Sequence, residues 1–186
     1  MLPNNLQPFI AVNLSAKQLD DPGFADALRE IIAETGANPH QIVLEITESS
    51  LMLNAEKSIY TLTKVRKTGV QIAVDDFGTG YSSLSYLSKM PVTKIKIDKS
   101  FVEHITTEQQ PRTIVSAIIM MPRAMEFDVV AEGVETQEQL EALRELGCDH
   151  IQGYLLSKPV PAAQFFEMLT RDSRGEHATS GADASV

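Results

Sequence analysis

Ile72-Ala73-Val74-Asp75-Asp76 is a run of three apolar residues that ends in two adjacent carboxylates. A short apolar run is typical of a strand in a parallel sheet, because helices cover such a strand. A polar residue at the carboxyl end of a buried parallel strand points toward a ligand site rather than into the core. The run therefore predicts a parallel strand that delivers Asp75 and Asp76 to a functional site.

Five further runs share this pattern and recur at the spacing of a repeating strand-helix unit: residues 10–13, 42–45, 95–98, 129–132 and 151–152. The carboxyl ends of parallel strands meet at the same end of a sheet. We therefore expect five carboxylates, one lysine and two amides to converge on one site. These residues are Asn13, Glu45, Asp75, Asp76, Lys96, Asp98, Glu132 and Gln152.

Segments with helical spacing lie between these runs. They are residues 22–35, 55–68, 112–127, 136–146 and 162–169. Gly36 and Gly69 follow the first two and indicate helix ends. Pro122 should kink or split the third, because proline lacks the backbone N–H that a helix interior uses. Alternating strands and helices predict an α/β fold with mostly parallel strands and right-handed crossovers.

The order of elements alone does not distinguish an open sheet from a closed barrel. Functional residues at the ends of six strands favour a barrel, since a doubly wound sheet gathers its ligands at one switch point. A complete barrel has eight strand-helix units and typically about 250 residues. This chain has 186 residues. We therefore predict an incomplete TIM-like (β/α) barrel with about six of the eight units.

The composition, 43% hydrophobic and 22% charged, is that of one soluble globular domain. Residues 171–186 are small and polar, which predicts a flexible C-terminal tail. We expect a cytoplasmic protein, because the longest apolar stretch is too short to span a bilayer and no signal peptide opens the chain. A net charge of −9 argues against binding of long nucleic acid. A small anionic nucleotide would need divalent cations at the acidic site.

Six motifs follow one another along the chain: Val12-Asn13-Leu14-Ser15, Leu44-Glu45-Ile46-Thr47-Glu48, Asp75-Asp76-Phe77-Gly78-Thr79-Gly80-Tyr81-Ser82-Ser83-Leu84, Lys96-Ile97-Asp98, Ala131-Glu132-Gly133-Val134-Glu135 and Gln152-Gly153-Tyr154. This ordered set closely resembles the EAL family of cyclic di-GMP phosphodiesterases, over about residues 9–169. The resemblance implies a TIM-like barrel in which two Mg²⁺ or Mn²⁺ ions drive hydrolysis of cyclic di-GMP to linear pGpG, in bacterial second-messenger signalling.

The resemblance also implies a metal-binding role for five residues of this sequence. Asn13, Glu45 and Asp75 look like ligands of one ion. Asp75 would bridge to a second ion that Asp76 and Glu132 hold. Hard oxygen ligands without a nearby Cys or His pair suit Mg²⁺ or Mn²⁺ better than zinc.

Lys96 looks like the family lysine that orients the attacking water and the phosphate. Together with Asp76 and Glu132 it is predicted to be catalytic. A structural salt bridge is the alternative for Lys96, because a buried lysine needs a carboxylate or phosphate partner. Asp98 and Gln152 resemble substrate contacts.

Three further residues resemble groups that support the ligands. Glu48 looks like the glutamate that anchors the loop at residues 77–84, to which Thr79 belongs. Glu135 follows the predicted ligand Glu132 at the end of its strand.

The Glu-Ala-Leu motif that names the family is absent from this sequence, which resembles the family from its third strand onward. The first two strands of the family carry a metal-ligating glutamate and a phosphate-contacting arginine. We therefore expect residues 1–170 to be a partial EAL domain with doubtful activity on its own. Residues 9–14 and 150–154 should form exposed sheet edges, through which we expect a homodimer. Sensor or cyclase domains are compatible with a full-length protein.

Two other functions remain open at this point. The chain is alternatively a noncatalytic module for cyclic di-GMP binding or for dimerisation, since the family includes such members. A barrel glycosidase that uses Glu45 and Glu132 is a third hypothesis. Glycosidase sites generally stack sugars on aromatic rings, whereas this chain has no Trp and only 6% aromatic residues.

Overall fold

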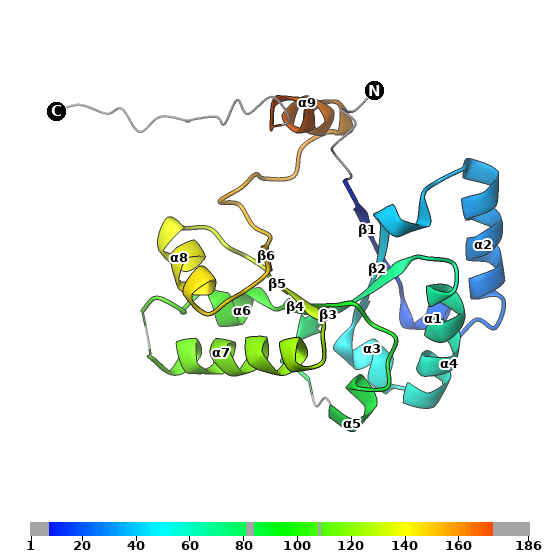
Figure 1. Cartoon of the computed structure of the whole chain (residues 1–186), viewed down its shortest axis with the longest axis horizontal. Coiled ribbons are helices and arrows are strands. Elements are labelled where there is room, and N and C mark those ends of the chain that lie inside the picture. The colour runs from blue at the N-terminus through cyan, green and yellow to red at the C-terminus, as the bar shows by residue number, and fades with distance from the viewer. Residues whose placement is uncertain (1–7, 81–83, 108, 173–186) are drawn as a thin grey trace. The chain divides into compact units, whose positions relative to one another are not determined.

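The computed structural model describes residues 8–80, 84–107 and 109–172 (Figure 1). The chain divides into two compact units. Residues 9–156 form one unit, which holds the sheet and helices α1 to α8. Residues 1–8 and 157–186 form the other, whose described helix is α9 (Ala162–Asp172).

Within the described residues, six parallel strands form one sheet in the order β1-β2-β3-β4-β5-β6. The strands are β1 (Ile10–Asn13), β2 (Ile42–Thr47), β3 (Gln71–Phe77), β4 (Lys94–Ile97), β5 (Asp128–Ala131) and β6 (His150–Ile151). Each predicted apolar run therefore forms a strand. Every crossover leads to the next strand on the same side, so the order never reverses as it does in a doubly wound sheet. This is the strand order of a barrel segment, and it confirms the predicted α/β incomplete barrel.

Helices connect successive strands, as Figure 1 shows. They are α1 (Ala16–Leu19), α2 (Phe24–Thr35), the 3₁₀ helix η1 (Pro39–Gln41), α3 (Glu48–Met52), α4 (Ala55–Arg66), α5 (Leu84–Leu87), α6 (Lys99–Val102), α7 (Gln109–Ala124) and α8 (Gln137–Glu145). Gly36 ends α2 in the left-handed conformation, as predicted. Pro122 does not split α7. It lies in the last turn, so the backbone hydrogen bond that it lacks is one of the last in that helix.

Alternation along the strands separates the core from the site. Leu44, Ile46 and Val74 are buried in a cluster that includes Leu62 and Val65 of helix α4. Each such side chain removed from water stabilises the fold by about 1.5 to 3 kcal/mol. Neighbouring strand residues point to the opposite face. Packing of these apolar residues against helices therefore turns the intervening polar residues toward the other face of the sheet.

Strands β1 and β6 stand at the two ends of the sheet. All four residues of β1 are exposed, among them Ile10 at 68% and Val12 at 47% of the residue's full exposure. The expected edges are thus present, and homodimerisation through them stays a prediction.

The predicted boundary at residue 170 falls within helix α9, which continues to Asp172. Residues 173–186, most of the predicted tail, lie outside the described residues. Among the described helices, none combines the length and the hydrophobicity that crossing a bilayer requires.

Candidate active site

Lys96 stands at the centre of a cluster of carboxylates at the carboxyl ends of the strands. Its Nζ atom lies 2.8 Å from Glu45 Oε1, 3.0 Å from Asp75 Oδ1 and 2.5 Å from Glu132 Oε1. The Lys96 side chain is 6% exposed, and those of its three partners are 14 to 19% exposed. Three predicted metal ligands, two in strands β2 and β3 and one directly after β5, therefore meet at one ammonium group.

Asp76 joins this cluster through an irregularity in β3. Adjacent residues of a regular strand point to opposite faces. The register between β3 and β4 shifts between Val74 and Phe77, and Asp76 has a left-handed backbone with φ +53°. Such a bulge re-aims a side chain. As a result, carboxylate oxygens of Asp75, Asp76 and Glu132 all lie within 4.8 Å of one another.

Hydrogen bonds within the loop and to Glu48 fix the backbone of the loop after β3. The Thr79 hydroxyl donates a hydrogen bond to the Asp76 carbonyl at 2.8 Å. Glu48 is only 2% exposed, and its Oε2 accepts a hydrogen bond from the Gly78 N–H at 2.9 Å. Glu48 therefore contacts the loop that the sequence predicted it to anchor. Residues 81–83 of that loop lie outside the described residues.

Burial and charge repulsion act together on the pKa values of the site. Burial raises the pKa of Asp76, and the charges of Asp75 and Asp98 raise it further. Burial also raises the pKa of Glu132, although contact with Lys96 opposes this. For Lys96, burial alone would lower the pKa, but its carboxylate partners outweigh burial and raise it. Four carboxylates thus share one ammonium, and the site has an excess of negative charge.

Asp75 provides a direct test of whether a cation fits this site. Its Oδ1 atom is buried and lies 3.0 Å from the Lys96 ammonium, which Glu45 and Glu132 also contact. One ammonium compensates the charge of three carboxylates only in part. Together with the oxygen-only ligand set, this favours a hard divalent cation at Asp75.

The remaining predicted residues surround this cluster. Asn13 is exposed and lies opposite Glu45 in the β1–β2 register. Asp98 caps helix α6, where its carboxylate accepts hydrogen bonds from the N–H, at 3.0 Å, and the hydroxyl of Ser100. Glu135 and Gln152 line a cavity of about 230 Å³, which Glu132 also borders.

Gln139 is a residue of the site region that sequence reasoning missed. Its side-chain carbonyl accepts hydrogen bonds from the N–H groups of Glu135, at 2.8 Å, and Thr136, at 3.0 Å. Its amide donates to the Val102 carbonyl at 3.4 Å. Gln139 therefore joins the loop after β5 to helix α6. The Thr-x-x-Gln pattern signals a helix start, but no sequence signal indicated the contact with Val102.

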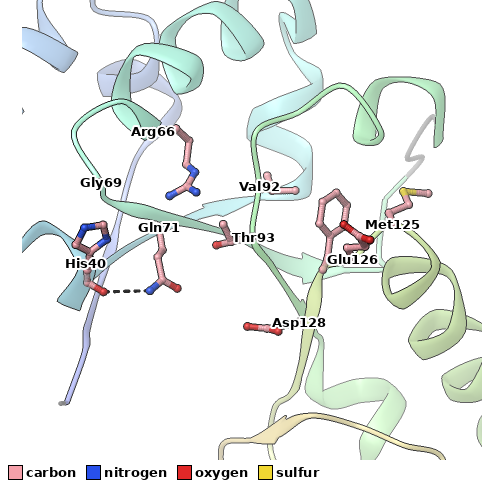
Figure 2. A pocket seen from close by; sticks show the side chains of 10 residues that line it. His40, Arg66, Gly69, Gln71, Val92, Thr93, Met125, Glu126 and Asp128 are labelled. Atoms are coloured by element: carbon pink, nitrogen blue, oxygen red, sulfur yellow. Dashed lines mark hydrogen bonds between the residues drawn. The ribbon is translucent and has the colours of Figure 1, made fainter. Parts of the chain in front are cut away.

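A larger cavity of about 610 Å³ lies at the opposite, amino-terminal end of the strands (Figure 2). Figure 2 shows His40, Arg66 and Gln71 on one side of it and Glu126 and Asp128 on the other. The Gln71 amide donates a hydrogen bond to the His40 carbonyl at 3.0 Å. None of the predicted site residues lines this cavity, so its volume does not mark the predicted chemistry.

Comparison with known proteins identifies the family. The sequence model described as "EAL domain" matches residues 2–159. The chain therefore belongs to the EAL domain family.

The bifunctional diguanylate cyclase/cyclic di-GMP phosphodiesterase MucR of Pseudomonas aeruginosa is 44% identical over 155 residues, which are 83% of this chain and 23% of MucR. The solved PaMucR phosphodiesterase in complex with c-di-GMP is 43% identical with a TM-score of 0.81, and the match covers 84% of this chain and 64% of that one.

A second solved structure, BlrP1 of Klebsiella pneumoniae in a manganese/cy-diGMP complex, is 32% identical with a TM-score of 0.75. The match covers 81% of this chain and 39% of that one. The chain spans between 19% and 23% of the length of the first curated relatives that it matches. Those relatives therefore contain substantial sequence beyond the region shared with this chain.

Proposed function

We propose that this chain carries part of the active site of a metal-dependent cyclic di-GMP phosphodiesterase. The observation that carries the proposal is the convergence of Glu45, Asp75, Asp76 and Glu132 around Lys96. Membership of the EAL family and the MucR and BlrP1 complexes with cyclic di-GMP support the same reaction. The reaction is hydrolysis of one phosphodiester bond to give linear pGpG.

The proposed cofactor is a pair of Mg²⁺ or Mn²⁺ ions. Asn13, Glu45 and Asp75 would hold one ion, and Asp75, Asp76 and Glu132 the other. The manganese complex of BlrP1 supports a divalent cation in this family. When bound, two such ions polarise a phosphoryl oxygen and lower the pKa of a coordinated water, which makes that water a nucleophile at neutral pH.

The chain's own side chains would position the substrate and the proton acceptors. The Lys96 ammonium, held among three carboxylates, would orient the phosphate and the attacking water. Gln152 and Asp98 would contact the nucleotide from the adjacent loops. Glu48 would keep the loop after β3 in place through the Gly78 N–H, and so fix the backbone that follows Asp75 and Asp76.

Two proteins test this proposal: the wild-type chain and its Asp75→Asn variant. With Mn²⁺ and cyclic di-GMP, the wild-type chain should release pGpG far more slowly than a protein extended to include a Glu-Ala-Leu strand, and the variant should release none. An extended protein that includes a Glu-Ala-Leu strand serves as the positive control for the assay. Absence of hydrolysis by the wild-type chain, together with retained cyclic di-GMP binding in Ca²⁺, would instead favour the noncatalytic binding module.

A further inference from the structure

We propose that Lys96 is a built-in counter-cation of the carboxylate cluster, and that its ammonium competes with a divalent cation for the same oxygen atoms. The inference rests on the proposed function, because it treats the partners of Lys96 as metal ligands. It adds a role that opposes metal binding to the role of Lys96 in orienting the substrate.

The contacts of Lys96 carry the first step of the argument. An ammonium group has three N–H donors. Lys96 Nζ lies within 3.0 Å of one oxygen each of Glu45, Asp75 and Glu132, and all three are proposed metal ligands. An oxygen atom that bonds a metal ion through the lone pair directed at the ammonium must give up that contact. Wherever the ion takes that lone pair, metal binding displaces Lys96 from the carboxylate concerned.

Charge carries the second step. A divalent cation placed among these carboxylates lies within a few ångströms of the ammonium, and the two repel each other. The pair is poorly screened because the Lys96 side chain is 6% exposed. Both effects lower metal affinity. Without the ammonium, the carboxylates would repel one another, so Lys96 stabilises the protein when no metal is bound.

The neighbouring lysine provides a matched control. Lys94 lies two residues earlier on β4, on the same face, and is 8% exposed against 5% for Lys96. Its Nζ atom pairs with a single carboxylate, Asp128 Oδ2, at 2.6 Å. Among the ion pairs of the described residues, none joins Lys94 to a proposed metal ligand. Replacing it removes a buried ammonium from the same strand without releasing a metal ligand.

The experiment measures Mn²⁺ binding by calorimetry in the wild-type chain, Lys96→Met, Lys96→Gln and Lys94→Met. We expect both Lys96 variants to bind Mn²⁺ at least about tenfold more tightly than wild type, because they lose a competing and repelling charge. Lys94→Met should bind as wild type does. Lys96→Gln keeps hydrogen-bond donors beside the carboxylates, so it provides a folded variant if Lys96→Met does not fold. Circular dichroism would detect such a folding defect.

A second readout is the rise in melting temperature on addition of Mn²⁺. It should be larger in the Lys96 variants, which start from a lower melting temperature in chelator and bind the ion more tightly. Equal or weaker Mn²⁺ binding by folded Lys96→Gln overturns the competition and leaves the proposed function standing. Failure of every protein, Lys96 variants included, to bind Mn²⁺ or Mg²⁺ overturns both proposals. Binding by the Lys96 variants alone supports the competition most strongly.

Discussion

Lys94 and Lys96 share one strand and one face, yet they stand in opposite electrostatic situations. At the amino-terminal end of β4, Lys94 is paired with Asp128, whose side chain is 52% exposed, and lies 5.7 Å from the centre of the Phe9 ring. At the carboxyl-terminal end, Lys96 faces three carboxylates, and a fourth, Asp76, lies beside them. The first lysine balances its partner, whereas the second leaves an excess of negative charge. The comparison teaches that a buried lysine indicates a functional site when the carboxylates around it outnumber its single positive charge.

The largest effect should come from removing a carboxylate partner of Lys96, compared with removing the partner of Lys94. Asp75→Asn takes away the proposed bridging ligand, so it should abolish metal binding and hydrolysis. Metal affinity should fall by about two orders of magnitude or more, which exceeds the 10 to 100-fold loss typical of residues that only support a ligand. Asp128→Asn removes the partner of Lys94 and should change neither. Calorimetry with Mn²⁺ on both variants decides. Unchanged Mn²⁺ binding in Asp75→Asn would show that the carboxylates around Lys96 do not differ from Asp128 in metal binding.

Glu48 should produce the next largest effect, although it is not a proposed ligand. Glu48→Ala removes the acceptor of the Gly78 N–H, so the backbone after Asp75 and Asp76 loses a fixed point. Metal affinity should fall by about 10 to 100-fold, as is typical for groups that support ligands. The exposed Glu141 provides a control, since Glu141→Gln should bind metal as wild type does. A metal affinity of Glu48→Ala equal to that of wild type would show that Glu48 does not support the metal ligands.

A third prediction concerns backbone packing beside Gln152, at the carboxyl ends of the strands. A Cβ atom on Gly153 would lie 2.1 Å from the Val134 carbonyl oxygen, so Gly153→Ala must displace the backbone next to Gln152. We expect a loss of about 1 to 3 kcal/mol in the free energy of unfolding and weaker cyclic di-GMP binding.

The matched control for this change is Gly36, which ends helix α2. A Cβ there meets nothing within 4 Å, although the backbone is left-handed with φ +66°. Gly36→Ala should cost about 1 kcal/mol in stability and leave ligand binding intact. Denaturant titration and a binding titration, run on both variants, separate the two effects. Weaker ligand binding in Gly36→Ala as well would show that the loss reflects stability alone.

The smallest effect concerns pH in the presence of a chelator. The pKa of Asp76 is raised above its ordinary value of 3.8, mainly by burial, so the folded protein takes up this proton more readily than the unfolded chain does. A raised carboxylate pKa destabilises the fold above the unfolded pKa, and this penalty shrinks as the pH falls. Asp76→Asn lacks the titrating group, and asparagine tolerates the left-handed backbone at this position.

Urea titrations across a range of pH values would measure this effect. Wild-type stability relative to Asp76→Asn should rise as the pH falls from 7 toward 4. A difference that stays constant, or that moves the other way, would show that the pKa of Asp76 is not raised in the folded protein.

Much of this architecture could be predicted because it depends on local patterns. Each of the six strands follows from a short apolar run, and the end of helix α2 follows from Gly36. The effect of Pro122 was predicted less well, since its cost depends on where the helix ends, and α7 ends two residues later. The partners of Gln139 could not be predicted either, because Val102 lies 37 residues away in the chain.

The sequence by itself determined which residues end the strands, the family, and the excess of acidic groups, because periodicity and motifs are properties of neighbouring residues. Tertiary structure alone decided that Lys96 contacts three carboxylates while Lys94 contacts one, since pairing across strands depends on register and on distance in space. It also decided that Asp76 turns to the same side as Asp75, because the bulge and the left-handed backbone at Asp76 arise where β3 pairs with β4. The chemistry of the site depends on those two outcomes.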